Sequence, residues 1–286
     1  MRKLLLSLIL LACASGASAQ CSNTSYGDGW TCVTTSSFFQ NSNSGIASIT
    51  TNINVNFVVG DLAIVSSQGC ASVGCNVATN QTITISDNAG DTFTCPLSNP
   101  QVNFGGNIVG AVACYVCRMI GPPTQFTATN SNTAAGAFTR IMVTSWHNSG
   151  GAIPTSCLDQ QSTSTFTTGS GTSAAFVTTS NATGNNDLIY SDLMGTTATG
   201  VNNSFTQAAF ISGINAEAKT GATPGSYPTG WTFASAPFFG DELAFFNPIS
   251  SSGVPRKHGT FITFKPNPFH RIPWAFRPNR MRVETI

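Results

Sequence analysis

The stretch Ile49-Thr50-Thr51-Asn52-Ile53-Asn54-Val55-Asn56-Phe57 places β-branched or aromatic residues at every odd position, with Thr or Asn between them. Successive side chains of a β-strand point to opposite faces, so this period of two predicts a strand with one buried and one solvated face. No convincing amphipathic helix follows the first 20 residues. The stretch therefore predicts an all-β fold.

Similar short runs rich in Val, Ile, Thr and Phe recur between Gly, Asn and Ser clusters. The run Ile108–Met119 is apolar at both odd and even positions, which predicts a central strand covered on both faces. Thr82–Ile85 and Thr92–Cys95 flank Asp87–Asp91 and predict a hairpin, with Gly90 at positive φ. Together these runs predict an antiparallel two-sheet β-sandwich of jelly-roll or immunoglobulin-like type.

One short motif is repeated in the two halves of the chain. Gly60-Asp61-Leu62-Ala63-Ile64 is similar to Asn186-Asp187-Leu188-Ile189-Tyr190, and each follows a Thr/Asn-rich run. One interpretation is that the halves contain equivalent strands, and the alternative is coincidence among strand-forming residues. No Pro-rich or charged linker separates the halves, so residues 20–266 are predicted to form a single domain.

The N-terminus has the pattern of a secretory signal peptide. A basic start is followed by the apolar run Leu4–Ala12 and by the small residues Ala17-Ser18-Ala19. We expect cleavage after Ala19, so that residues 1–19 are removed and no transmembrane span remains. The mature protein is then secreted, extracellular or periplasmic. The alternative is a lipoprotein anchored through Cys13, because Leu10-Leu11-Ala12-Cys13 fits a loose lipoprotein motif.

Charge is sparse and unevenly distributed. Only 8% of the residues are charged, against about 25% in ordinary globular proteins. Residues 20–255 have a net charge of −7, whereas residues 256–286 have +6. The acidic body has no basic patch of the kind that binds nucleic acid, so no nucleic-acid partner is predicted. The 41% hydrophobic content is too high for a disordered chain.

The C-terminal residues 267–286 form a basic tail rich in Pro, Arg and aromatic residues. Pro268, Pro273 and Pro278 are spaced so that neither a regular helix nor a central strand can form. We expect a disordered terminus. Two alternatives are an anionic-surface contact by Arg with interleaved aromatic residues, and a shifted reading frame after the last strand.

Eight cysteines follow the signal peptide and predict disulfides that reinforce the N-terminal half. They are Cys21, Cys32, Cys70, Cys75, Cys95, Cys114, Cys117 and Cys157. Cys114 and Cys117 lie within one predicted strand, about 10 Å apart and on opposite faces, so they cannot bond to each other. They are expected to bond to Cys95 and Cys157, while Cys21 with Cys32 and Cys70 with Cys75 are local pairs. Other connectivities stay open.

Candidate ligand-binding residues are few. Trp146, His147 and Trp231 could stack on or hydrogen bond to a sugar, although most aromatic residues of a sandwich belong to the core. Asp87 and Asp91 concentrate carboxylate oxygens that suit calcium, and the alternative is a turn stabilised by its own side chains. No other cofactor is predicted.

The sequence contains few residues in patterns typical of catalytic sites. The chain has no G-x-S-x-G, no H-E-x-x-H and no phosphate-binding loop. Glu217 and Glu242 are the only glutamates of the body and could serve as a glycosidase pair, the alternative being two solvated surface residues. Enzyme activity is therefore not the main prediction.

Several short motifs resemble a known set of proteins. Gly60-Asp61-Leu62, the turn 86–93, Leu158-Asp159-Gln160, Asn186-Asp187-Leu188 and the closing strand Phe261–Pro266 occur in this order. Over roughly residues 48–266 the chain resembles a broad set of uncharacterised secreted bacterial β-sandwich domains. The resemblance implies a sandwich fold, an extracellular location and no known catalytic residues. The dense cysteines and the tail depart from that pattern.

These observations predict a non-catalytic, secreted or surface-associated binding or adhesion module for glycan or another envelope component. One alternative is a self-associating structural protein of the envelope or matrix, because uncharged Thr- and Asn-rich strands do not protect sheet edges from pairing. The other is a carbohydrate-active hydrolase on a β-sandwich. The sequence does not predict the oligomeric state.

Overall fold

The structure is a computed structural model of the 286-residue chain. The chain divides into two compact units, Met1–Ser250 and Ser251–Ile286, and every described residue belongs to the first. The predicted signal peptide, the predicted strand Phe261–Phe264 and the basic tail lie outside the described residues. These are 21–41, 48–52, 57–70, 82–104, 107–130, 138–161, 166–168, 173–176, 185–194, 198–201, 203–211, 213–221, 223–232 and 238–246.

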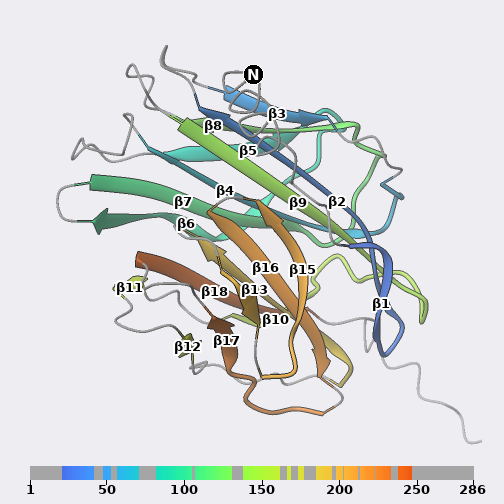
Figure 1. The fold of residues 1–286 in the computed structure, drawn as a ribbon. Coiled ribbons are helices and arrows are strands. Elements are labelled where there is room, and N and C mark those ends of the chain that lie inside the picture. Colours follow the sequence, from blue (N-terminus) through green and yellow to red (C-terminus); the bar gives the residue numbers. More distant parts are fainter. Residues whose placement is uncertain are drawn as a thin grey trace, which may run out of the picture. The chain divides into compact units, whose positions relative to one another are not determined.

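All the described regular elements are β-strands, and every pair is antiparallel, which confirms the all-β prediction. The strands form four sheets (Figure 1). Sheet A has the order β1-β2-β9-β4-β7-β6. Its strands are β1 (Ser22–Gly27), β2 (Trp30–Asn41), β9 (Phe138–Asn148), β4 (Leu62–Cys70), β7 (Asn107–Val116) and β6 (Thr94–Phe104).

Sheet C has the order β10-β18-β13-β16-β15, with a further strand, β11, also paired with β18. Its strands are β10 (Leu158–Gln161), β18 (Phe238–Phe246), β13 (Asp187–Met194), β16 (Ile214–Gly221), β15 (Thr206–Ile211) and β11 (Phe166–Thr168). Two three-stranded sheets complete the fold. Sheet B contains β3 (Ser48–Asn52), β8 (Gln125–Asn130) and β5 (Ile83–Asp87), and sheet D contains β12 (Ser173–Phe176), β17 (Thr229–Thr232) and β14 (Gly200–Val201).

The two halves of the chain repeat one strand order. The order β2-β9-β4-β7-β6 in sheet A corresponds, in chain order, to β10-β18-β13-β16-β15 in sheet C. In the same way β3-β8-β5 in sheet B corresponds to β12-β17-β14 in sheet D. The chain therefore contains an internal structural duplication.

The repeated sequence motif lies at equivalent places in this duplication. Gly60 and Asn186 both have positive φ, at 94° and 62°, in the turns that lead into β4 and β13. The aspartates that follow them, Asp61 and Asp187, are both buried. Glycine and asparagine adopt positive φ most readily. This explains why these two residue types occur in the turn that leads into a central strand in each half.

Sheet A is covered on both faces, as the apolar run Ile108–Met119 predicted. In β7, Ala111, Ala113 and Tyr115 belong to a buried cluster that also contains Leu188 and Tyr190 of sheet C. The intervening residues Val112, Cys114 and Val116 belong to a second cluster, shared with Ile49, Ile83 and Phe126 of sheet B. Because successive residues of a strand point to opposite faces, these two clusters lie on opposite faces of sheet A.

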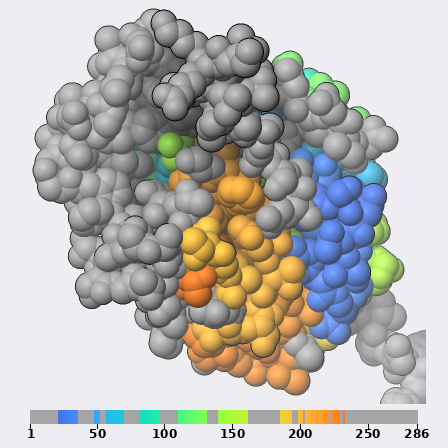
Figure 2. All heavy atoms as spheres, viewed as in Figure 1, coloured from blue at the N-terminus to red at the C-terminus, as the bar shows by residue number. Residues whose placement is uncertain are grey.

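Strand β1 joins the edges of sheets A and C. Tyr26 Oη donates a hydrogen bond to Gln207 O (3.3 Å), and Thr220 Oγ1 donates to Tyr26 O (3.2 Å). Trp30 Nε1, at the start of β2, donates to Asn186 O (2.9 Å). Figure 2 shows the N-terminal segment, in blue, beside the orange strands of sheet C on the same face of this unit.

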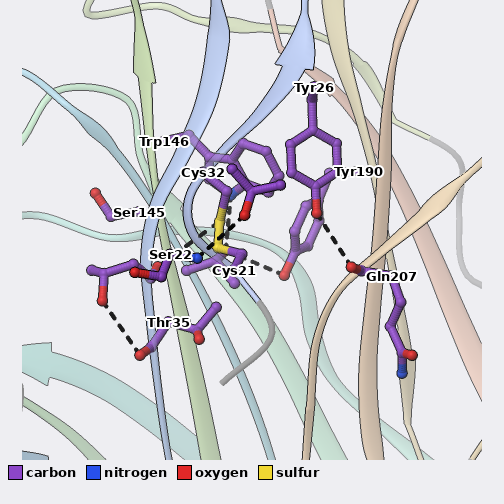
Figure 3. The surroundings of a disulfide bond; sticks show 12 residues. Cys21, Ser22, Tyr26, Cys32, Thr35, Ser145, Trp146, Tyr190 and Gln207 are labelled. Atoms are coloured by element: carbon purple, nitrogen blue, oxygen red, sulfur yellow. Dashed lines mark hydrogen bonds between the residues drawn. A yellow bond between two sulfur atoms is a disulfide. The ribbon is translucent and has the colours of Figure 1, made fainter. Parts of the chain in front are cut away.

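Three disulfides confirm most of the predicted cysteine pairing. They are Cys21–Cys32, Cys95–Cys114 and Cys117–Cys157. Cys114 and Cys117 bond elsewhere and not to each other, as their strand geometry required. The first disulfide lies beside Trp146 and Tyr190 (Figure 3). The predicted Cys70–Cys75 pair falls outside the described residues, because Cys75 does.

Two local predictions are wrong. The segments around Asp87–Asp91 do not form a hairpin, because β5 pairs with β8 in sheet B whereas β6 pairs with β7 in sheet A. The intervening turn takes the chain from one sheet to the other, although Gly90 has the expected positive φ (81°). Glu217 is not a solvated residue, since its side chain is fully buried on β16.

Candidate functional site

One end of sheet A collects ionisable side chains from distant parts of the sequence. Strands β4 and β6 begin there, and their antiparallel neighbours β7 and β9 end there. Asp61 precedes β4, Arg118 follows β7, His147 is the penultimate residue of β9 and Asp91 precedes β6. Sheet register thus places four charged or titratable residues at one end.

His147 and Asp61 form a close pair. His147 Nδ1 lies 2.8 Å from Asp61 Oδ1, and Ser145 Oγ donates a hydrogen bond to Asp61 Oδ2 (3.5 Å). The histidine side chain is 53% exposed, whereas that of Asp61 is 2% exposed. Burial raises the pKa of Asp61, while contacts with His147, Ser145 and the Val58 backbone act in the opposite direction. The pair presents a surface imidazole oriented by a buried carboxyl group.

The described side-chain hydrogen bond of His147 is made by Nδ1. A nucleophilic triad needs a hydroxyl group on the other ring nitrogen, and Ser145 contacts the carboxyl group instead. Among the described contacts, the buried carboxyl group of Asp61 thus accepts the Ser145 hydroxyl and lies against His147 Nδ1.

Asp87 stabilises its own turn. Its Oδ1 accepts hydrogen bonds from the backbone N–H groups of Ala89 (3.1 Å), Gly90 (2.8 Å) and Asp91 (3.1 Å). Asp91 Oδ1 accepts from Ile120 N–H (2.8 Å). Burial, followed by the neighbouring Asp87 carboxyl group, raises the pKa of Asp91, and its bond from Ile120 acts in the opposite direction. These bonds are the local side-chain contacts that favour Asp in turns.

The same two aspartates were candidate calcium ligands. In the described part of the chain, no group of three or more His, Cys, Asp or Glu side chains could hold a metal ion.

A pocket of ≈ 360 Å³ lies at this end of sheet A. Its walls come from residues 91–94, 115–120 and 155–158, and the Cys117–Cys157 disulfide joins the last two segments. Arg118 and the hydroxyl groups of Thr92, Thr94, Thr155 and Ser156 contribute to the lining. The lining therefore combines one cation and the carboxyl group of Asp91 with several neutral donors and acceptors.

The outer face of sheet B has two rows of hydroxyl groups. Register places Ser48, Thr129 and Thr84 side by side in one row, and Thr50, Thr127 and Ser86 in the next. All six residues are exposed or half-buried. Neighbouring hydroxyls bond across the strands, with Ser48 Oγ 3.0 Å from Thr129 Oγ1 and Thr50 Oγ1 2.9 Å from Thr127 Oγ1. We call this surface the hydroxyl face.

The three predicted ligand-binding residues lie in different places. Trp146 is fully buried, with its ring 4.9 Å from that of Tyr26 and 5.9 Å from that of Tyr190 (Figure 3). Trp231 is also fully buried, in a cluster with Leu193. Both tryptophans occupy core positions, the alternative that the sequence left open. His147 is the one of the three that reaches the surface.

The glutamate pair of the hydrolase alternative is separated by sheet register. Glu217 is paired with Ser191, whereas Glu242 is paired with Asp192. Adjacent residues of a strand belong to opposite faces of the sheet. The register therefore assigns the two glutamate positions to opposite faces of sheet C.

Sequence reasoning did not single out Arg118 or the hydroxyl face. The alternation of Ser or Thr with Ile in 48–50 and 83–86 is the signal for that face. Its significance depends on which strands are neighbours, and only the sheet register supplies that information. Arg118 has no local motif at all, because the pocket is built from three separate segments.

No protein-family model matches the chain, and no curated protein matches it. Three disulfides indicate an oxidising environment outside the cytoplasm. The described residues include no helix long and apolar enough to cross a bilayer.

Proposed function

We propose that this protein is a secreted, non-catalytic adhesion module that binds an uncharged, hydroxyl-rich polymer, such as a polysaccharide of an envelope or matrix. The hydroxyl face of sheet B carries the proposal. We also infer that each half of the chain is an eight-stranded sandwich of jelly-roll type, which would hold this face rigid. The repeated strand order supports that inference.

The chemistry of the face suits such a polymer. Adjacent strands are about 4.8 Å apart and alternate residues along a strand are about 6.5 Å apart, so the six hydroxyls form a regular array. None of the six positions is charged, and the one charged residue of the three strands, Asp87, alternates to the other face. A neutral array can exchange hydrogen bonds with sugar hydroxyls without desolvating an ion.

The core behind the face keeps the array in place. Ile49, Ile83, Phe126 and Ala128 alternate with the hydroxyl residues and are buried against sheet A. Because their side chains are held by packing, the hydroxyl rows are preorganised, which lowers the entropy cost of binding.

The proposal is tested by co-sedimentation of the mature protein with insoluble polysaccharides such as cellulose, chitin and β-glucan. Thr127→Lys places a long charged side chain in the centre of the hydroxyl face and is expected to reduce binding at least about tenfold. Thr206→Lys makes the same change at an exposed position of β15 and is the matched control, expected to bind as the wild type.

Equal binding by both variants would remove the hydroxyl face as the adhesion surface. If no polymer binds and light scattering shows growth of large assemblies with concentration, the self-associating alternative replaces this proposal.

A further inference from the structure

We infer that the pocket beside the Cys117–Cys157 disulfide binds a hydroxylated carboxylate, for example a uronic acid residue. This ligand is anionic and small, whereas the partner proposed for sheet B is neutral and extended. The inference uses different residues and does not rest on the proposed adhesion function.

The charge of the pocket comes from Arg118. Its side chain is exposed and lines the pocket, and it makes no ion pair within the described part of the chain. Arginine presents a planar fork of N–H donors that matches the two oxygens of a carboxylate. The site therefore offers a cation that is available to an external anion.

Asp91 also lines the pocket but does not compete for Arg118. Its Oδ1 accepts the hydrogen bond from Ile120 N–H at 2.8 Å, and its carboxyl group neighbours that of Asp87. Its Oδ2 atom is buried. Asp91 and Arg118 form no ion pair within the described part of the chain, so the guanidinium N–H groups stay available to a ligand.

The rest of the lining favours a sugar acid over a simple inorganic anion. Thr92, Thr94, Thr155 and Ser156 supply hydroxyls that can donate to and accept from ligand hydroxyls. Ile120, whose side chain is 69% exposed, adds an apolar wall that can contact the C–H groups of a sugar ring. A volume of ≈ 360 Å³ lies at the lower end of the range for small-molecule sites, about 300–1,000 Å³.

The internal duplication provides a comparison within the same chain. Ala63 pairs with Val116 in the first half, and its counterpart Ile189 pairs with Lys219 in the second. Two residues further on, Arg118 corresponds to Gly221. Asp61 and Asp187, by contrast, recur at equivalent places and are buried in both halves. A cation at the Arg118 position occurs in the first half alone, so the duplicated fold does not require a cation there.

Isothermal titration of the mature protein with D-galacturonate, D-galactose and D-gluconate tests this inference. We expect galacturonate to bind at least about tenfold more tightly than galactose. Arg118→Gln should weaken galacturonate binding by about tenfold or more and leave galactose unchanged, because a charge-assisted hydrogen-bond pair is lost. Lys219→Gln removes the same charge from a residue outside the pocket and should have no effect.

Several results would overturn the inference: no galacturonate binding, equal affinity for the acid and the neutral sugar, or undiminished binding by Arg118→Gln. Gluconate binding as tight as that of galacturonate would support a site for hydroxylated carboxylates in general, and much weaker binding would support one for ring-shaped uronic acids. Thr127→Lys should leave galacturonate affinity unchanged, so this site and the adhesion surface can fail independently.

Discussion

Asp192 is a buried carboxyl group at the end of a hydrogen-bond chain between sheets A and C. Trp146 Nε1 donates to Thr144 Oγ1 (2.9 Å), and Thr144 Oγ1 donates to Tyr190 Oη (3.3 Å). Tyr190 and Ser66 in turn contact Asp192. Burial raises the pKa of Asp192 to about 7, although these two contacts act in the opposite direction.

This shift predicts how stability depends on pH. The unfolded chain releases the Asp192 proton near pH 3.8, whereas the folded protein retains it until about pH 7. The stabilisation that the folded protein gains from retaining this proton is therefore fully present below about pH 4 and is lost as the pH rises to 7. Over that range the free energy of unfolding should fall by up to about 4 kcal/mol in urea titrations.

Asp192→Asn should flatten most of this slope, since the amide does not ionise. A smaller slope should remain, because burial also raises the pKa of Asp61. The exposed Asp28 provides the control, and Asp28→Asn should retain the wild-type slope. An unchanged slope in Asp192→Asn would show that other groups cause the pH dependence.

At the scale of the element, sequence patterns predicted individual strands better than their partners. Alternation in 49–57 predicted one-sided burial, which β3 confirms for the described part of that stretch, and the apolar run from Ile108 correctly predicted two-sided burial. The same patterns could not show that β5 and β6 belong to different sheets, because Asp87 and Gly90 form a similar turn in either arrangement. Pairing is decided by contacts with β8 and β7, which are distant in sequence.

The Cys117–Cys157 disulfide joins the segment at the end of β7 to the segment at the start of β10, and residues of both segments line the pocket. It closes a segment of sequence separation 40, against 11 for Cys21–Cys32. Replacing both cysteines of either pair with Ala should lower the free energy of unfolding by about 2–5 kcal/mol. The loss should be about 1 kcal/mol greater for the longer loop.

Galacturonate affinity should distinguish the variant that lacks Cys117–Cys157 from the variant that lacks Cys21–Cys32. Loss of Cys117–Cys157 frees the segment that carries Thr155 and Ser156, so galacturonate affinity should also fall. Loss of Cys21–Cys32 should leave that affinity unchanged, because neither cysteine lines the pocket. Equal effects on binding would show that the disulfide does not position the pocket wall.

At the scale of the described unit, the duplicated halves share one core. Trp30 and Trp146 of the first half pack in the same cluster as Leu188 and Tyr190 of the second. We therefore expect the two halves to unfold in one calorimetric transition, since neither half can unfold without exposing this cluster to solvent.

Leu188→Ala should test that coupling. Its side chain is fully buried in the shared cluster, so a cavity there should cost about 2–5 kcal/mol and lower a single melting temperature. Val59→Ala, at a valine that is 54% exposed, should change stability by less than about 0.5 kcal/mol. Two separate transitions would show that the halves are independent.

The motif shared by Gly60–Ile64 and Asn186–Tyr190 was the part of this duplication that the sequence could reveal. The positive φ and the buried aspartate restrict the residues at those positions in both halves. Elsewhere equivalent positions hold unrelated residues, as with Arg118 and Gly221, so similarity fades while the strand order persists. The hydroxyl face and the pocket both depend on register between segments, which no local pattern encodes.

The contacts of β1 have a consequence for how the protein is made. Its hydrogen-bond partners in sheet C, at residues 207 and 220, lie more than 180 positions later in the chain. A polypeptide that is synthesised N-terminus first must therefore leave this strand incomplete until the second half has been made. The short Cys21–Cys32 loop can form within the first residues to emerge. It would keep β1 next to β2 during the wait, and shield an unfinished edge from other nascent chains.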